Sequence, residues 1–284
     1  MRIIEETILS DSKIKYVLKN KLHFSSALLT KIKNNGEVFL NGNVARLSDE
    51  AKTGDVLRVV IPTLLSSGIE PEQASLEILY EDEDVICINK PRGIPSHPSQ
   101  GHRSGTLANF AVYHLKDTND EFHIVTRLDN YTSGIVLAAK NAFSAAIMCT
   151  KEYNSTLKKE YVALCRGVFD AKSGIIEAPI ARCDNSIIKR MVRSDGKYAK
   201  TEFEVIGENN NISLLKLILH TGRTHQIRVH MSHIGHPLVN DFLYDDNAED
   251  GKMFSLHCKK ISFVHPYTKK DIEVVAPLPE YFML

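Results

Sequence analysis

Apolar residues near the N-terminus recur at helical spacing in two short stretches. Residues 13–22 carry Ile14, Val17, Leu18 and Leu22, and residues 25–33 carry Leu28, Leu29 and Ile32. A repeat every three or four residues marks one buried face of a helix. The apolar runs EVFLNG (37–42) and DVLRVVIP (55–62) then read as strands around a turn at Asn41-Gly42. Residues 1–62 are therefore predicted to form a compact helix–helix–strand–turn–strand unit.

From residue 76 onward the pattern changes to apolar runs of strand length that are separated by turn residues. Helical spacing returns in three places, at 106–115, 142–153 and 224–234. The predicted strands are DVICINK (84–90), SGIVLAAK (133–140), KEYVALCRG (159–167), AKTEFEVIG (199–207), NISLLKLILH (211–220), MFSLHCKKISFV (253–264) and DIEVVAP (271–277). Many strands with few helices predict an α+β fold around a large, mostly antiparallel sheet.

The stretch between these two regions, TLLSSGIEPEQAS (63–75), has no periodicity and is typical of a linker. The sequence thus predicts a small module at 1–62, a linker at 63–75 and a large domain at 76–284.

Composition and cysteine usage narrow the class of protein. The chain has 284 residues, 43% of them hydrophobic and 25% charged, which is ordinary for a globular protein. No run of about eighteen apolar residues could span a membrane, and the N-terminus lacks a signal-peptide pattern, so we expect a cytoplasmic protein without membrane contact. The five cysteines include no C-x-x-C pair, which favours buried free thiols over a disulfide framework or a zinc ribbon.

The net charge is zero, but basic residues are concentrated in two regions. Residues 1–62 hold ten Lys or Arg against seven acids, and residues 150–200 hold eleven against six. Seven acids and no base lie between, at 63–84. Local basic surfaces attract polyanions even on a neutral protein.

Motifs for cofactors and metals are absent from the sequence. Neither a dinucleotide-binding G-x-G-x-x-G nor a phosphate-binding P-loop occurs. The His-rich stretch at 220–236 lacks the H-E-x-x-H spacing, and no acid lies between Leu219 and Asn240. Its arginines, Arg223 and Arg228, suit recognition of phosphate or carboxylate. We expect no metal and no cofactor.

A polar, turn-like stretch, TRLDNYTSG (126–134), precedes one of the apolar strands. Its acid, Asp129, is open to two interpretations. It is either a turn former that binds its own backbone or a functional carboxylate beside Arg127.

Several blocks resemble the RluA-type RNA pseudouridine synthases. RLDNYTSG is similar to the family signature H-R-L-D-x-x-T-S-G, with Thr126 in place of the usual His. Further blocks follow in the family's order over residues 76–280: DVICINKPRGIPSHPS, LKKEYVALCRG, the RCD…RMV…GKYAKT loop, LHTGRTHQIRVHMSHIGHPLVND, SLHCKKISFVHPYTKK and APLP. The N-terminal unit resembles a small alpha-L RNA-binding module.

The resemblance implies a cofactor-free isomerase that converts uridine to pseudouridine. It implies Asp129 as the catalytic carboxylate, Arg228 as its partner and Tyr161 as the aromatic residue on the uracil. It also implies Arg127, Thr132 and Arg223 as substrate-binding residues. Arg127 would fill the gap left when the target nucleotide is flipped out.

The sequence leaves the RNA partner open. Ribosomal RNA is favoured and transfer RNA is the other candidate, and a monomer is expected. A non-catalytic RNA-binding protein in ribosome assembly, with the same basic surfaces, is the alternative function.

Overall fold

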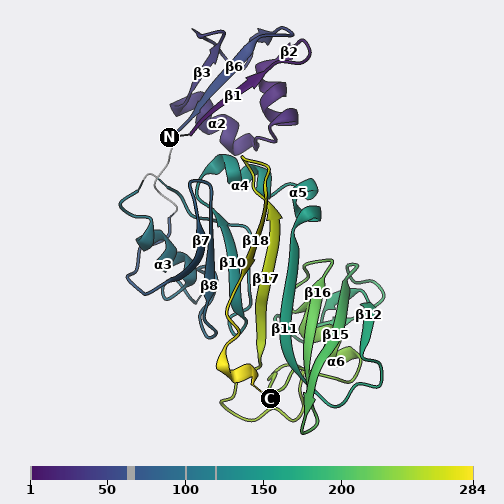
Figure 1. Ribbon diagram of the computed structural model, residues 1–284. Helices are drawn as coiled ribbons and strands as arrows, with labels where there is room; N and C mark the ends of the chain where they lie inside the picture. Colours follow the sequence, from purple (N-terminus) through teal and green to yellow (C-terminus); the bar gives the residue numbers. More distant parts are fainter. Residues whose placement is uncertain (1, 63–67, 100, 119, 284) are drawn as a thin grey trace.

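We describe a computed structural model that covers residues 2–62, 68–99, 101–118 and 120–283. The described residues form a small N-terminal sheet with three helical segments and a large sheet with four α-helices (Figure 1). No helix in these ranges is long and apolar enough to cross a membrane. Residues 63–67 of the predicted linker lie outside the described residues, and 68–76 have no regular structure.

The N-terminal module has a four-stranded sheet in the order β1-β6-β3-β4. Its strands are β1 (Arg2–Thr7), β6 (Val56–Ile61), β3 (Glu37–Leu40) and β4 (Asn43–Val44), and a separate ladder joins β2 (Ser12–Lys13) and β5 (Glu50–Ala51). The helical segments are α1 (Ile14–Tyr16), the π-helical η1 (Val17–Lys21) and α2 (Ser26–Asn35). The apolar positions of both predicted helices pack into one core with Leu57 and Val59.

The sequence prediction omitted strand β1. This strand pairs antiparallel with β6 along its whole length, Arg2 opposite Ile61 and Thr7 opposite Val56. It lies at the edge of the sheet, and Ile4 is its only described side chain that is fully buried. A strand that buries so little has a weak alternation of apolar and polar residues, which explains the omission.

The large sheet has ten strands, and eight of them run in the order β12-β15-β16-β11-β17-β10-β8-β7. β18 pairs with β17, and β9 pairs with β10. The strands are β7 (Glu77–Glu81), β8 (Val85–Lys90), β9 (His123–Ile124), β10 (Ser133–Ala139), β11 (Lys158–Arg166), β12 (Ser173–Glu177), β15 (Lys200–Asn209), β16 (Ile212–Leu219), β17 (Leu256–Val264) and β18 (Asp271–Val275). A separate hairpin joins β13 (Ile180–Arg182) and β14 (Arg190–Val192).

The expectation of a mostly antiparallel α+β fold is confirmed. Among the described strand pairs, β10 and β17 run parallel, and they are in register only at Ser133–His257 and Gly134–Cys258. Gly134 has φ +103°, and a Cβ there would lie 2.3 Å from the Cys258 carbonyl oxygen. The close crossing of these two strands therefore requires glycine.

The helices of the large domain are short. They are α3 (Leu107–His114), α4 (Ala142–Met148), α5 (Lys151–Thr156) and α6 (Gln226–His233), with a 3-10 turn η2 (Glu280–Phe282) near the C-terminus. The single helix expected at 142–153 was wrong. It breaks at Thr150, whose extended backbone starts a new helix and whose side chain caps the Tyr153 N–H.

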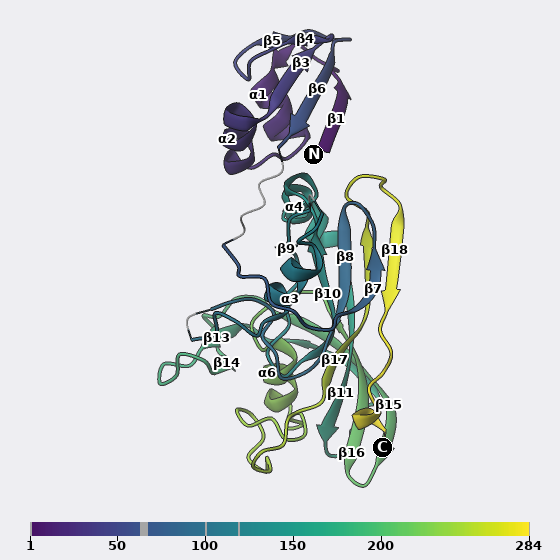
Figure 2. The same ribbon diagram turned by 90° about the vertical axis from the view of Figure 1, so that its left-hand side faces the viewer.

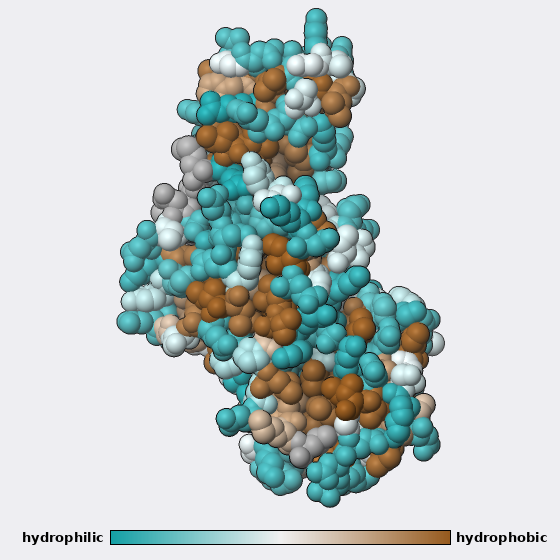
Figure 3. Space-filling model, viewed as in Figure 1, coloured by the Kyte–Doolittle hydropathy of each residue, from teal (hydrophilic) through white to brown (hydrophobic). Residues whose placement is uncertain are grey.

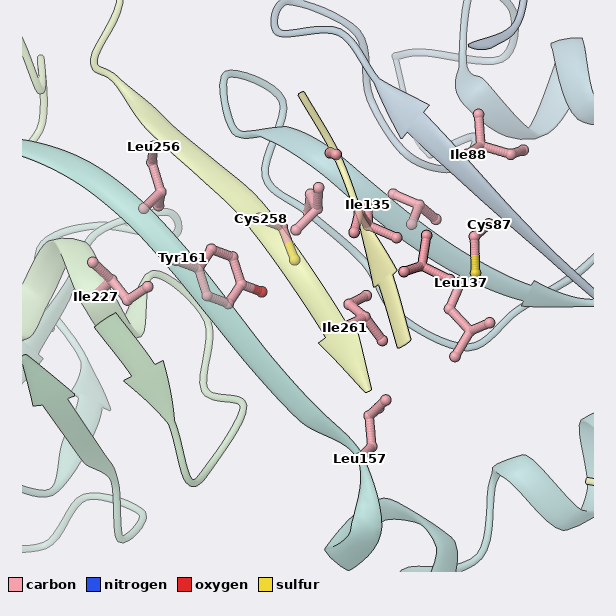
Figure 4. Close-up of a cluster of buried hydrophobic side chains, with 14 of the residues drawn as sticks. Cys87, Ile88, Ile135, Leu137, Leu157, Tyr161, Ile227, Leu256, Cys258 and Ile261 are labelled. Atoms are coloured by element: carbon pink, nitrogen blue, oxygen red, sulfur yellow. The ribbon is translucent and has the colours of Figure 1, made fainter. Parts of the chain in front are cut away.

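Helices α3 and α6 lie on one side of the large sheet (Figure 2), and the 3-10 turn η2 packs on the other side, where Phe282 contacts Val162 and Leu164 of β11. Figure 3 shows the molecule in the orientation of Figure 1, with apolar patches between larger hydrophilic areas. The main core runs through the centre of the sheet, where Tyr161, Leu256, Cys258 and Ile261 come from the adjacent strands β11 and β17 (Figure 4).

The N-terminal module contacts the large domain through α4. Phe143 of α4 is buried in the module's own core, with its ring 5.9 Å from that of Phe24. Arg2 donates a 2.8 Å bond to Asp84 and lies 4.0 Å above the ring of Tyr267. Apolar, ionic and cation–π contacts together hold the module on this end of the sheet.

Candidate active site

The described residues enclose a cavity of about 1050 Å³ on the large domain. Its lining comes from four segments, at 95–99, 125–132, 151–161 and 219–228, and from Leu256 of β17. Asp129 is the one acidic side chain among these lining residues. Five others are basic: Arg127, Lys151, Lys159, Arg223 and Arg228. A cavity with one carboxylate and five cationic side chains attracts a polyanionic ligand. The same cations surround the Asp129 carboxylate.

The backbone on both sides of Asp129 is held by the segment that follows β8. The Ser96 hydroxyl donates to the Leu128 carbonyl at 2.8 Å and accepts from the Leu128 N–H at 3.1 Å. The Gly93 N–H donates to the Asn130 carbonyl at 2.9 Å. Asp129 thus lies in a short loop whose two neighbours are fixed from outside the loop.

Lys90 completes this support from inside the protein. Its side chain is fully buried, and Nζ donates to the carbonyl oxygens of Pro91, Ile94 and Asn130 at 2.9–3.0 Å. Burial lowers the pKa of Lys90 to about 7, and the nearby Asp129 carboxylate opposes that shift. The three carbonyl acceptors favour the protonated amine, so Lys90 ties β8 to the loop that carries Asp129.

Arg228 lies between two carboxylates. Its Nη1 is 3.3 Å from Asp129 Oδ2, while Nε and Nη2 donate to the two oxygens of Asp241 at 2.6 and 2.8 Å. Both Arg228 and Asp241 are buried, whereas 32% of the Asp129 side chain is exposed. Burial alone would lower the pKa of Arg228, but the hydrogen bonds and charge of Asp241 outweigh it and the pKa is raised.

Helix α6 aims Arg228 at the cavity because its other face is anchored to β15. Gln226 and His230, one turn apart, both meet the Thr201 hydroxyl, at 3.0 and 2.9 Å. His230 also lies 2.9 Å from the Ala178 carbonyl. Arg228, two residues from each of them, projects from a different side of the helix toward Asp129.

His225 starts α6 in an unusual conformation. Its φ of 58° is left-handed, which costs a residue with a Cβ about 1 kcal/mol or more. Its Nδ1 is 2.9 Å from the Tyr244 hydroxyl, and its Nε2 is 3.8 Å from Asp129 Oδ2. Burial lowers the pKa of His225 despite the Asp129 charge, which favours a neutral imidazole beside the carboxylate.

Tyr161 lies in the cavity wall on β11, among Leu256, Ile227 and Cys258 (Figure 4). Its side chain is buried, and its hydroxyl bonds to the Cys258 sulfur. Burial raises the pKa of Tyr161 well above its ordinary value, with Cys258 adding to the effect. The phenol is therefore neutral and presents a ring to the cavity.

The three expected substrate-binding residues also line the cavity. Arg127 is exposed, Arg223 donates from Nε to the Tyr198 carbonyl at 2.9 Å, and Thr132 is buried with no hydrogen-bond partner for its hydroxyl among the described residues. Thr126, which replaces the usual His, has a structural use: its hydroxyl accepts from the Leu137 N–H at 2.9 Å. The hydroxyl thereby holds the start of the signature against β10.

No cluster of three or more potential metal ligands occurs among the described residues. The histidines of the His-rich stretch bond elsewhere, His230 to Thr201 and His236 to the Arg166 carbonyl at 2.8 Å.

The sequence analysis did not identify the residues that hold the cavity side chains and the Asp129 loop in place. Asp241 is the clearest case, together with Lys90, Ser96 and His225. A signal was present for two of them: a lysine ends an apolar strand at Lys90, and an acid follows the apolar run PLVN at Asp241. Nothing local marks Ser96 or the backbone of His225.

Comparisons with known proteins agree with this geometry. The family model described as RNA pseudouridylate synthase matches residues 84–233. The chain is 41% identical over 264 residues to a Bacillus subtilis protein named as the uncharacterized RNA pseudouridine synthase YjbO, covering 92% of this chain and 93% of the relative. It is 34% identical over 276 residues to the ribosomal large subunit pseudouridine synthase D of Pasteurella multocida, covering 91% and 84%.

A solved structure is similar as well. The human RNA pseudouridylate synthase domain containing 1 superposes with a TM-score of 0.61 and 26% identity, over 72% of this chain and 86% of that one. Sequence, fold and cavity lead to one family: the chain belongs to the RNA pseudouridylate synthases and is an RluA-type RNA pseudouridine synthase, an isomerase.

Proposed function

We propose that the protein converts particular uridines in structured RNA to pseudouridine, with Asp129 as the catalytic carboxylate. The observation that carries the proposal is the position of Asp129, which is the one acid among the described lining residues of a basic cavity and lies 3.3 Å from Arg228. Membership of the family indicates the reaction, and Asp129 is the carboxylate of the cavity that is available for it.

The reaction requires that the bond between uracil N1 and ribose C1′ breaks and that C5 then bonds to C1′. An ionised carboxylate beside C1′ stabilises or traps the electron-poor sugar. Arg228 orients the Asp129 carboxylate, because its guanidinium donates to Oδ2 at 3.3 Å. Tyr161, neutral and buried, provides an aromatic wall for the uracil ring.

Two other arginines of the cavity, Arg127 and Arg223, have a separate role in binding RNA. Arg127 is exposed at the cavity and makes no hydrogen bond or ion pair with other described residues, so it can occupy the space that a flipped nucleotide leaves in the helix. Arg223 and the Thr132 hydroxyl are suited to the backbone and sugar of the same nucleotide. No metal or organic cofactor enters this scheme.

Ribosomal RNA is the favoured substrate and transfer RNA the second candidate. The support is the relative named for the ribosomal large subunit and the basic N-terminal module, which we propose to be an RNA-binding module of the alpha-L type joined by the 63–75 linker. The five cysteines are free, which suits the reducing cytoplasm as the place of action.

The test is the Asp129→Asn variant, which keeps the side-chain volume but removes the anion. We expect pseudouridine formation to fall to background, because an amide oxygen is a poor nucleophile without full charge. The assay measures tritium released from C5 of labelled uridine in transcripts of ribosomal and transfer RNA. RNA affinity, measured beside it, should persist or increase, since a negative charge near a polyanion is removed.

Asp120→Asn, a partly exposed acid outside the lining of this cavity, is the control and should leave tritium release unchanged. Release at the wild-type rate by Asp129→Asn would contradict the assignment of the carboxylate. RNA binding by the wild type without conversion of any uridine would favour the ribosome-assembly function instead.

A further inference from the structure

Lys159 lies two residues before Tyr161 on β11, so both side chains project from the same side of the sheet into the cavity. It is paired with Leu219 of β16 and Ile261 of β17, in the interior of the sheet. Its Nζ lies against the loop before α6, where a Cβ on Gly222 would be 3.6 Å away. Lys159 and Tyr161 are therefore neighbours on the cavity wall.

The ammonium group of Lys159 differs from the other interior lysines in its partners. Lys90 has three carbonyl acceptors, and Lys140 has Glu81 at 2.8 Å and Asp120 at 3.1 Å. For Lys159 Nζ, no hydrogen bond or ion pair occurs within the described ranges. Burial lowers the pKa of Lys159, and Cys258 opposes the shift. A half-buried cation without an anion is costly, so the site is poised for an anionic group that enters the cavity.

The reaction itself generates such a group. When the N1–C1′ bond breaks, its electron pair stays with uracil, and the negative charge spreads from N1 onto the carbonyl oxygens O2 and O4. We propose that Lys159 is a further catalytic residue, which donates a hydrogen bond to a carbonyl oxygen of the departing uracil and stabilises its charge. The inference rests on the proposed active site around Asp129 and Tyr161.

The step balances without another reactant. Uracil takes the electron pair of the broken bond, and the C1′ centre is stabilised by the Asp129 carboxylate. After rotation, an electron pair of the ring forms the C5–C1′ bond. C5 then loses its proton to water, and N1 gains one from water. Lys159 keeps its own proton throughout and acts only by hydrogen bonding and charge.

A backbone phosphate is the other anion that a lysine here could meet. The position of Lys159 favours the base, because it is half-buried beside the aromatic wall, whereas Arg127 and Lys151 are exposed and better placed for phosphates. The two possibilities differ in kinetics. A contact to the leaving group affects the rate of the bound complex, and a phosphate contact affects affinity and its salt dependence.

The experiment compares Lys159→Met with Lys158→Met under single-turnover conditions. Lys158 is the exposed neighbour on the same strand and faces the other side of the sheet. The probe is whichever tritium-labelled ribosomal or transfer RNA transcript the wild type converts, with enzyme in saturating excess. A charge-assisted hydrogen bond in the transition state predicts a rate lower by about 10- to 100-fold for Lys159→Met, with Kd within about threefold.

The pH profile provides a second readout. A rate that needs protonated Lys159 falls as the pH rises through the pKa of this lysine, which is below its ordinary value of 10.5. Lys159→Met should lack this decline of the rate at alkaline pH. Lys159→Arg keeps the charge, so it should recover part of the rate, and its rate should decline only at a higher pH than that of the wild type. If Lys159→Met folds poorly, Lys159→Gln carries the same expectation.

Three outcomes would overturn the inference. An unchanged saturated rate in Lys159→Met removes the catalytic role. An unchanged rate with weaker binding and a salt slope flatter by about 0.7–0.9 assigns a phosphate contact instead. A wild type that releases no tritium from any transcript, in the presence of RNA binding, overturns the proposed function itself, and with it this role.

Discussion

Arg228 binds two carboxylates that do different work. Asp241 takes two of its nitrogens in a buried, bidentate pair, and Asp129 takes the third at a longer 3.3 Å. The rings of Phe254 and Tyr244 lie 4.4 and 5.1 Å from the guanidinium carbon. Asp241 and the two rings thus hold the guanidinium of Arg228 in place, and its Nη1 in turn holds the Asp129 carboxylate at the cavity.

Asp241→Asn should reduce turnover although Asp241 does not line the cavity. Loss of the bidentate partner frees Arg228 to reorient, so we expect at least a 10-fold lower single-turnover rate. The free energy of unfolding should fall by about 3 kcal/mol, as for a broken buried ion pair. The rate comes from tritium release and the stability from urea denaturation.

Asp245→Asn is the matched control, since Asp245 is a buried acid four residues along the same segment that pairs with Arg166 at 2.7 Å. It should lower stability and leave the rate of the folded protein nearly intact. A wild-type rate in folded Asp241→Asn would show that Arg228 needs no second carboxylate.

The residues expected from the sequence to form the active site were brought together by the structure. Asp129, Tyr161 and Arg228 stand in blocks with strong family spacing, and all three line one cavity. Asp241, Lys90 and Ser96 act through backbone or through another side chain, and their partners lie far away in the sequence. Lys90 meets Asn130 forty residues on, and Ser96 meets Leu128 after thirty-two. A local stretch of sequence gives no signal of partners that lie so many residues apart.

At the scale of elements, β10 and β17 approach closely where they cross, at Gly134 and Cys258. Next to Gly134, Ser133 Oγ is 2.9 Å from His257 Nδ1 and 2.7 Å from the Tyr281 hydroxyl. His257 is fully buried, and burial lowers its pKa to about 4, with Lys259 contributing. The strand that follows Asp129 is thus fastened through a neutral histidine.

Because the pKa of His257 is lowered in the folded protein, we expect the protein to lose stability in mild acid. The unfolded chain takes up the proton near pH 6.5 and the folded chain only near pH 4, so stability is complete above 6.5 and decreases as the pH falls toward 4. His257 alone should lower the free energy of unfolding by about 2 kcal/mol between pH 7 and pH 5. Urea denaturation at both pH values measures it.

His257→Asn, which cannot take up a proton in this range, should show a smaller difference between the two pH values. Substitution of an exposed histidine, His102→Asn, should leave the wild-type difference unchanged. An equal pH dependence in wild type and His257→Asn would mean that other groups cause the acid sensitivity.

The spacing of apolar residues predicted the helices and strands that bury one face. It did not predict the edge strands or the helix break, which depend on contacts and caps that leave no repeat in the sequence. The seven predicted strands of the large domain all occur, and each contributes apolar side chains to the main core. β1, at an edge, and the short hairpin β13–β14 bury too little to show an alternation. The break between α4 and α5 comes from the Thr150 cap, which apolar spacing does not register.

At the scale of the whole molecule, two basic surfaces are held in a fixed relation. The cavity lies on the large domain, and the module is docked on this domain by Phe143 of α4, which enters the module's core, and by the bond of Arg2 to Asp84. Of the four lysines Lys13, Lys15, Lys31 and Lys33 of the module, Lys31 lies 3.9 Å from Glu121 of the large domain, whereas the other three are exposed. The exposed three are the candidates for phosphate contacts.

Changing these three lysines to glutamine should weaken RNA binding and its dependence on salt. Each lost phosphate contact flattens the slope of log affinity against log salt by roughly 0.7–0.9. Filter binding at several salt concentrations measures the slope. The saturated rate of tritium release should stay unchanged, because the cavity keeps all its residues.

A matched variant removes three exposed lysines of the large domain instead, namely Lys116, Lys172 and Lys252. It should alter the slope much less, although the change in net charge is the same. Equal slopes in the two triple variants would indicate that only the total charge matters and that the module has no specific contact.

Asp129 and Arg228 meet across 99 positions of the chain, and this distance has a consequence for folding. The strands that bring them together are interleaved: β10 lies beside β17, and β17 beside β11, although the three are far apart in chain order. Such non-local pairing must be complete before the pair exists, and it makes folding slow. A partly folded chain therefore lacks the Asp129–Arg228 pair, and a newly made molecule completes the proposed active site only when its last long-range strand is in place.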